Sequence, residues 1–178
     1  DFMILFRRRD ELTHEVIRVL KHDNIAVTGL DRISLSDNLA VMDLLSIAKF
    51  VLNPEDDLNL CSLLKSPIME ASEQDIYNIS INRGRSSAWE YIISNEDYIA
   101  VCKKLQIFAD LYATSHIGDF FQYIVDVLGY RTILNENCGV DSNDAINELL
   151  NTCDNFCKQN NNSIQNFIFW INEYNNSI

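Results

Sequence analysis

The apolar segment between Asp37 and Asn53 restricts the fold of this chain more than any other part of the sequence. Its spacing predicts a helix with apolar residues on two adjacent sides, which leaves only a narrow polar stripe. Such a helix is stable when neighbouring elements cover most of its surface, so we expect it at the centre of the core. Its apolar residues are Leu39, Met42, Leu45 and Leu52 on one side and Val41, Leu44, Ala48 and Val51 on the next.

The sequence after Ser34 predicts helices throughout. Ser34 with Asp37 is a candidate capping box for the apolar helix, and Pro54 is expected at the first helical position of the next. Ser66-Pro67 should break that second helix, and Ser72 with Asp75 should cap a third that ends near residues 82–85. Further helices are expected over residues 97–114, 118–128, 144–158 and 163–175, with a polar loop at residues 135–143.

The first residues differ from the rest of the chain. Two short apolar runs, residues 2–6 and 25–27, flank a helical pattern over residues 10–21, which predicts a β-α-β start. We therefore expect a mainly α protein in which a short β-α-β start precedes an all-helical, bundle-like subdomain. The expected division is residues 1–34 and residues 35–178.

Composition excludes several classes of protein. The chain has 178 residues, of which 47% are hydrophobic, and only five glycines and two prolines, so it should form a packed domain. A net charge of −12 argues against a general nucleic-acid coat or a protein that binds anionic membranes. Six of the 14 basic residues lie in residues 1–32, so any phosphate contact is expected there. The chain begins at Asp1 without a methionine, and we expect it to be part of a longer protein.

The residue types suggest no catalytic centre. The five glycines are scattered and none precedes a Lys-Ser or Lys-Thr pair, so no phosphate-binding loop is expected. The histidines and cysteines do not cluster at metal-ligand spacing, and the five cysteines are interpreted as reduced, mostly buried side chains in the cytoplasm. No run approaches the roughly 20 apolar residues of a membrane span. The one basic cluster, Arg7-Arg8-Arg9, is open to two interpretations: a solvated strand end paired with Asp10 and Glu11, or a ligand contact.

The order of these segments resembles the UvrD/Rep-type superfamily 1 DNA helicases. In that family a strand ending in Leu-Tyr-Arg precedes a helix, a Gly-Gly segment with Arg-Phe, and an acid-led helix. Then come an Asn-x-x-Asp-Asp turn and a Thr-Pro or Ser-Pro break. The counterparts here are Ile4-Leu5-Phe6-Arg7, Thr28-Gly29 with Arg32, Ser36-Asp37, Asn53-Pro54-Glu55-Asp56-Asp57 and Leu64-Lys65-Ser66-Pro67. The triple arginine and the Leu-Leu-Lys-Ser-Pro motif are most similar to the AddA branch, the helicase-nuclease subunits related to RecB.

The resemblance covers residues 2–76 and implies a function for a longer parent chain. The parent would be an ATP-dependent 3′-to-5′ DNA helicase and exonuclease of double-strand break repair, using ATP and Mg²⁺, with an AddB-like partner subunit. Residues 1–34 would form an edge of the RecA-like motor domain 2A, and residues 35–178 a helical 2B-like accessory subdomain that contacts or regulates duplex DNA at the fork. Double- and single-stranded DNA would be bound through the parent protein. This part should hold no cofactor and have no activity alone. The resemblance suggests that Arg7 and Arg32 contact DNA or a neighbouring domain, and Arg8, Arg9 and Lys65 are added as their neighbours.

The chain departs from the family at one position that matters for DNA. UvrD and Rep have a Gly-Ile-Gly turn after the Thr-Pro break, whose backbone approaches duplex phosphates. The corresponding residues here are Met69-Glu70-Ala71-Ser72, which lack both glycines and add a negative charge. The competing hypothesis is therefore an acidic, all-helical module that binds a protein and not a nucleic acid. A small-molecule enzyme has no supporting site.

Overall fold

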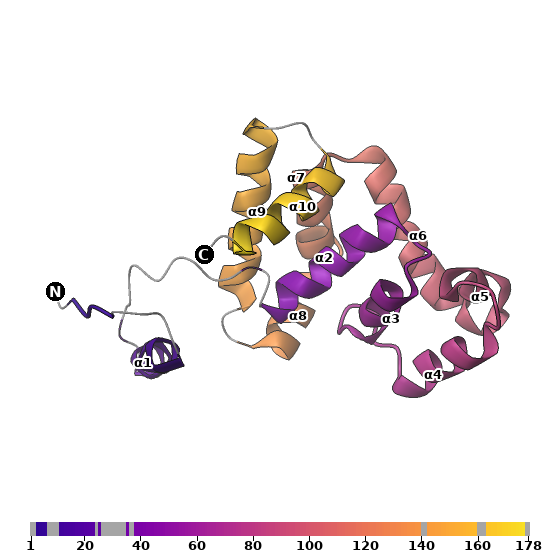
Figure 1. Cartoon of the computed structure of the whole chain (residues 1–178), viewed down its shortest axis with the longest axis horizontal. Helices are drawn as coiled ribbons and strands as arrows, with labels where there is room; N and C mark the ends of the chain where they lie inside the picture. Colours follow the sequence, from indigo (N-terminus) through magenta and orange to yellow (C-terminus); the bar gives the residue numbers. More distant parts are fainter. Residues whose placement is uncertain are drawn as a thin grey trace. The chain divides into compact units, whose positions relative to one another are not determined.

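The computed structural model describes residues 3–6, 11–23, 25, 35, 38–139, 142–159 and 163–176. The chain divides into two compact units, unit 1 (Asp1–Ile33) and unit 2 (Ser34–Ile178). Unit 1 contains helix α1 (Glu11–His22), and unit 2 contains α2 to α10 (Figure 1). The prediction of a mainly α protein is confirmed. Within the part of the chain that the structure describes, no helix combines the length and apolar character that a membrane crossing requires.

The predicted β-α-β start is not supported beyond its helix, because residues 3–6 and Ile25 form no strand. A strand is stabilised by hydrogen bonds to a neighbouring strand, and none accompanies residues 3–6 among the described residues. Their apolar side chains are exposed, from 37% at Phe6 to 86% at Leu5. Ala26 and Val27, the remainder of the second predicted strand, lie outside the described residues.

Helix α2 (Leu39–Leu52) is central to unit 2, as its apolar pattern predicts. It packs against α3, α6, α8, α9 and α10, and it crosses the middle of the unit in Figure 1. Its N-cap is Asn38, whose side-chain oxygen accepts hydrogen bonds from the Ala40 and Val41 N–H groups at 3.0 and 3.4 Å. The expected Ser34–Asp37 capping box lies outside the described residues. The helix buries Ala40, Val41, Leu44, Leu45, Ile47, Ala48 and Phe50.

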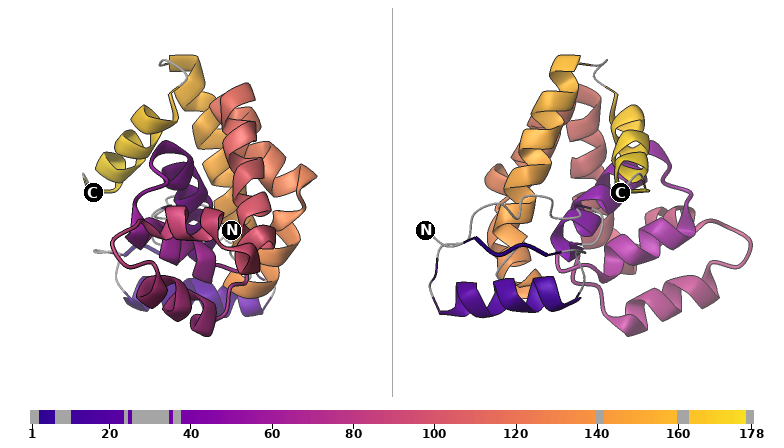
Figure 2. Two further views of the ribbon diagram at one scale, coloured as in Figure 1. Left: turned by 90° about the vertical axis from the view of Figure 1, so that its right-hand side faces the viewer. Right: turned by 60° about the vertical axis from the view of Figure 1, so that its left-hand side comes forward.

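The other helices of unit 2 gather at two ends of the unit (Figures 1 and 2). One end consists of α3 (Asp57–Lys65), α4 (Glu73–Asn82) and α5 (Ala88–Ser94). The 3-10 turn η2 (Glu96–Tyr98) and α6 (Ile99–Thr114) lead away from it. The other end consists of α7 (Ile117–Gln122), the π-helical turn η3 (Tyr123–Val127), α8 (Tyr130–Cys138), α9 (Ser142–Gln159) and α10 (Ile164–Asn176). Helix α9 packs on α2, α7 and α8.

Several local predictions are corrected by the structure. Pro54 lies in the turn before α3, and Asp56 caps that helix because its carboxylate accepts the Asn59 N–H at 3.0 Å. The expected loop at residues 135–143 is wrong, because α8 extends to Cys138 and α9 begins at Ser142. Glu136 and Asn137 are exposed on α8, whose inner side buries Leu134, and Ser142 at the start of α9 is buried. The capping box at Ser72 and Asp75 is confirmed, whereas the similar box of Ser87 and Glu90, which starts α5, was not predicted.

Candidate functional site

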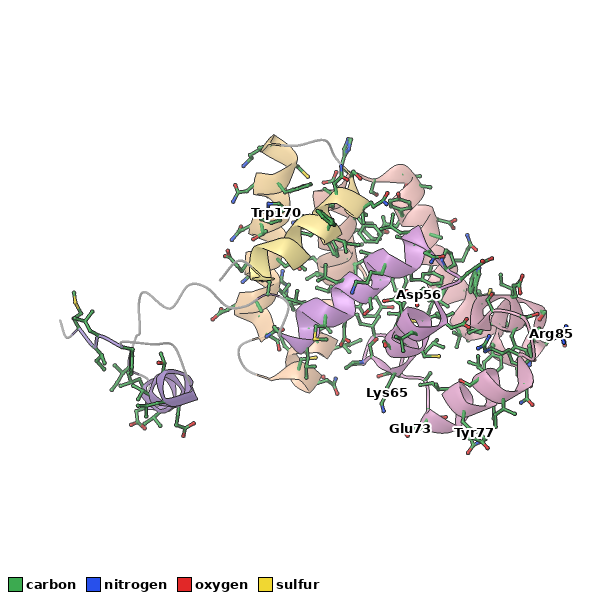
Figure 3. The ribbon with its side chains drawn as sticks, viewed as in Figure 1. Asp56, Lys65, Glu73, Tyr77, Arg85 and Trp170 are labelled. Atoms are coloured by element: carbon green, nitrogen blue, oxygen red, sulfur yellow. The ribbon has the colours of Figure 1, made fainter. Side chains whose placement is uncertain are left out.

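Lys65 is the one predicted site residue that lies among the described residues. Arg7, Arg8, Arg9 and Arg32 lie outside them. Lys65 is in the last turn of α3, and its ammonium is 2.6 Å from a carboxylate oxygen of Glu73 on α4. Their side chains are 65% and 82% exposed, and both lie along one edge of the unit in Figure 3. Because Lys65 already has an acidic partner, a phosphate would have to compete with Glu73 for it.

The Asn-x-x-Asp-Asp turn connects α2, α3 and the α4–α5 turn. Asn53 is the C-cap of α2, and its N–H donates to the Lys49 carbonyl at 3.0 Å. Asp57 accepts the Ala88 N–H at 2.7 Å with one carboxylate oxygen, and its other oxygen is 2.8 Å from the Arg83 guanidinium. The second aspartate therefore holds the start of α5 against α3, whereas the first, Asp56, caps α3. No local sequence pattern predicts the Asp57 contacts, because both partners lie more than 25 residues further along the chain.

The Ser66-Pro67 break forms a tight turn that ends in a left-handed residue. The Met69 and Glu70 N–H groups both donate to the Ser66 carbonyl, and the Ala71 N–H donates to the Leu64 carbonyl at 3.0 Å. Glu70 has φ of +56°, a backbone conformation that favours glycine. The chain thus adopts a glycine-type conformation at Glu70, whose carboxylate is exposed. Burial raises the pKa of Tyr130, and the negative charge of Glu70 adds to this effect.

Asp43 is the one acidic residue of the predominantly apolar helix α2. The Cys138 thiol of α8 lies 4.0 Å from its carboxylate, within hydrogen-bonding range for sulfur. Burial raises the pKa of Asp43 to about 6, and burial followed by the Asp43 charge raises the pKa of the Cys138 thiol. Cys138 therefore resists ionisation, and we interpret this pair as a contact between α2 and α8 and not as a nucleophile with its base.

A shallow, open cleft of about 340 Å³ lies between the start of α7 and the last turns of α9. Helices α7 and α9 approach each other closely at Gly118, where a Cβ atom would lie 2.9 Å from Asp154 Oδ1. Burial raises the pKa of the Cys157 thiol, and a hydrogen bond from the Gly118 N–H opposes this effect. A thiol with a raised pKa is a poor nucleophile near neutral pH. The cleft is lined by His116, Gly118, Asp119, Asp154 and Cys157.

The described residues offer neither a metal centre nor a cradle for a nucleotide. Across residues 38–139, 142–159 and the other described segments, no three His, Cys, Asp or Glu side chains are arranged to hold a metal ion. Gly84, Gly118, Gly129 and Gly139 lie in separate turns or helices, so they form no phosphate-binding loop. No family model matches the chain, and no curated protein is similar to it in sequence.

Proposed function

We propose that this chain is part of a UvrD/Rep-like superfamily 1 DNA helicase of the AddA type. Its helical unit 2 is the 2B-like accessory subdomain, and its first residues are an edge of motor domain 2A. The ordered match of residues 2–76 to that family carries the proposal: the strand-like run with Arg7, Gly29 with Arg32, the turn at residues 53–57 and the Ser66-Pro67 break. Helices α2, α3 and α4, with breaks at these motifs, are compatible with it.

The parent protein would be an ATP-dependent 3′-to-5′ helicase and exonuclease that acts in double-strand break repair in the cytoplasm, with an AddB-like partner. ATP and Mg²⁺ would bind outside this chain, because the chain has no Gly-x-x-x-x-Gly-Lys-[Ser/Thr] loop. That loop should be encoded upstream of Asp1 in the parent gene. Its absence there would refute the helicase proposal.

Within this proposal, Arg7, Arg8, Arg9, Arg32 and Lys65 face DNA or a neighbouring domain. We would measure binding of the full chain to a forked duplex by fluorescence anisotropy across a salt series, with a variant that has all five residues changed to Ala. A DNA-facing role predicts weak binding that falls steeply with salt and disappears in the variant. Binding that survives in the variant would assign the contact to other residues. An absence of binding at low salt would remove the DNA role of these residues.

Lys65 provides a sharper control within the same experiment. Since Glu73 already pairs with Lys65, Lys65→Ala alone should change DNA binding by less than about twofold, whereas Glu73→Gln should strengthen it by releasing the ammonium. A large loss from Lys65→Ala would show that DNA displaces Glu73.

The alternative is an acidic protein-protein interaction module without a nucleic-acid role. Of the chain's 26 acidic and 14 basic residues, 20 and 8 lie in residues 34–178. Three of those basic residues, Lys65, Arg83 and Arg131, form ion pairs with acidic residues of the unit. A unit with this charge balance repels phosphates. The alternative predicts no DNA binding at any salt concentration in the anisotropy experiment.

A further inference from the structure

Residues 83–86 form the turn between α4 and the N-cap of α5, and this turn places a serine beside two arginines. Gly84 has φ of +61° there, a backbone conformation that favours glycine. The Ser86 N–H donates to the Arg83 carbonyl at 3.1 Å, and the Arg83 guanidinium donates to the Ser86 carbonyl at 2.7 Å. Ser86 and Arg85 are exposed, and Figure 3 shows Arg85 at the outer edge of the unit. The turn is therefore ordered by two hydrogen bonds and accessible to another protein.

The hydroxyl of Ser86 is free to react. It forms no hydrogen bond with the part of the chain that the structure describes. The hydroxyl of the next residue, Ser87, accepts the Glu90 N–H at 3.2 Å as the N-cap of α5. The hydroxyls of two other exposed serines, Ser62 and Ser94, donate to backbone carbonyls. Of the two adjacent serines, Ser86 is thus the one that can be modified without the loss of a helix cap.

We propose that Ser86 is the phosphate acceptor of a serine/threonine protein kinase that selects arginine three residues before its substrate serine. Arg83 has that position, and Arg85 adds a second positive charge directly before Ser86. Both charges complement an acidic substrate groove on the kinase. In the transfer, Ser86 Oγ attacks the γ-phosphorus of ATP, an Oγ–P bond forms, and the bond between that phosphorus and the β–γ bridging oxygen breaks. The hydroxyl proton passes to a carboxylate of the kinase, and ADP leaves.

A phosphate on Ser86 would act on the contact between α3 and α5. The Arg83 guanidinium is 2.8 Å from the Asp57 carboxylate, and both side chains are about one third exposed. The phosphate carries a charge of about −1.5 to −2 at pH 7 and strong acceptor oxygens. It would lie close to the guanidinium, which already donates to the Ser86 carbonyl. The phosphate therefore competes with Asp57 for Arg83 and weakens the contact that holds the start of α5.

The ion pair and the kinase also compete for the same guanidinium. A kinase that binds Arg83 in its groove has to displace Asp57, so the ion pair slows phosphorylation in the folded chain. This inference goes beyond the helicase proposal and does not depend on it. Its test contains no DNA, so the failure of one proposal leaves the other standing.

The test incubates the full chain with MgATP and the catalytic domain of a serine/threonine kinase that selects arginine three residues before the acceptor. Tandem mass spectrometry locates the phosphate. We expect phosphorylation at Ser86 and its loss in Ser86→Ala. Arg83→Ala should lower the rate by about tenfold or more, although the loss of its ion pair by itself makes the turn more accessible.

Two matched variants test the competition for Arg83. Asp57→Asn keeps an oxygen for the Ala88 N–H but loses the charge that holds Arg83, so it should raise the rate by about threefold or more. Asp56→Asn removes the neighbouring charge, which has no part in that ion pair, and should leave the rate within about twofold of the original. In the phosphorylated chain, hydrogen exchange should accelerate for the amides of α5 and stay unchanged for those of α9.

Three outcomes would overturn the proposal. One is the absence of phosphate on the folded chain under conditions in which the kinase phosphorylates a peptide of residues 80–90. The second is a phosphate that forms on another serine, or that forms on Ser86 as fast in Arg83→Ala as in the original chain. The third is unchanged hydrogen exchange at α5 in the fully phosphorylated chain, because the phosphate would then not compete with Asp57.

Discussion

The two ends of unit 2 are held together by different forces. At the end formed by α7, η3, α9 and α10, the rings of Phe120, Phe121 and Phe167 are fully buried. The ring centroids of Phe120 and Phe121 are 5.3 Å apart, and those of Phe121 and Phe167 are 6.1 Å apart. At the end formed by α3, α4 and α5, every residue of which is described, α3 buries Leu60, Leu63 and Leu64, whereas α4 buries one apolar side chain, Ile79, and α5 buries Ala88 and Ile92. The two outer helices of that end, α4 and α5, depend more on capping boxes and on the contacts of Asp57.

This difference has consequences for stability. A buried aromatic side chain contributes a few kcal/mol through the apolar area that it removes from water, whereas a hydrogen bond in a half-exposed site contributes about 1 kcal/mol net. We therefore expect α4 and α5 to open locally before the aromatic end. Hydrogen exchange should be faster for the amides of α4 and α5 than for those of α2 and α9, and equal protection at both ends would contradict this comparison.

The largest expected effect is at the aromatic end. Phe120→Ala removes a fully buried ring that contacts Phe121 and Tyr112, and it should lower the free energy of unfolding by about 3–5 kcal/mol. Urea denaturation followed by circular dichroism measures this change. Phe169→Ala, at a side chain that is 63% exposed, is the control and should cost less than about 1 kcal/mol. Similar losses in the two variants would mean that the Phe120 cluster is not a core.

The next prediction distinguishes the structural roles of Asp56 and Asp57 at the end formed by α3, α4 and α5. Asp57→Ala leaves the Ala88 N–H without its acceptor and removes the ion-pair partner of Arg83, which still donates to the Ser86 carbonyl; it should cost about 1–3 kcal/mol. Asp56→Ala removes one N-cap hydrogen bond and should cost about 1 kcal/mol. Hydrogen exchange at α5 should accelerate in the Asp57 variant but not in the Asp56 variant. The reverse order would show that capping, and not the contact with α5, stabilises this end.

A third effect concerns Asp43, the half-buried acid of α2. Because burial raises the pKa of Asp43 to about 6 from 3.8, the folded chain binds this proton more tightly than the unfolded chain does. The contribution of Asp43 to stability is therefore most favourable below about pH 4 and is lost as the pH rises through 6. Asp43→Asn should remove that dependence and raise the free energy of unfolding at pH 7 by about 1–2 kcal/mol, after allowance for solvent near this half-buried group.

Paired urea titrations at pH 4 and pH 7 measure the Asp43 effect. The control is Glu148→Gln on α9, at an exposed carboxylate, and it should leave the pH dependence unchanged. Loss of stability in Asp43→Asn at pH 7 would mean that the ionised carboxylate is itself a stabilising partner of α8.

Local sequence determined most of the helices. The periodicity of residues 39–52 was sufficient to predict α2 and its central position, because a helix with so few polar positions has to be covered. The capping box of Ser72 and Asp75 was equally readable, since both residues act within one turn. The polarity of residues 135–143 predicts a loop, whereas α8, whose inner side buries Leu134, continues to Cys138.

Tertiary structure decided the features that join segments distant in sequence. Whether the apolar run at residues 3–6 becomes a strand depends on a partner that no local pattern specifies. The partners of Asp57, the pairing of Lys65 with Glu73, and the burial of Asp43 against Cys138 likewise follow from how α3, α4, α5 and α8 pack. Periodicity and capping act within a few residues and can be read from the chain alone. Burial, pKa values and ion pairs depend on distances through space, which only the folded arrangement sets.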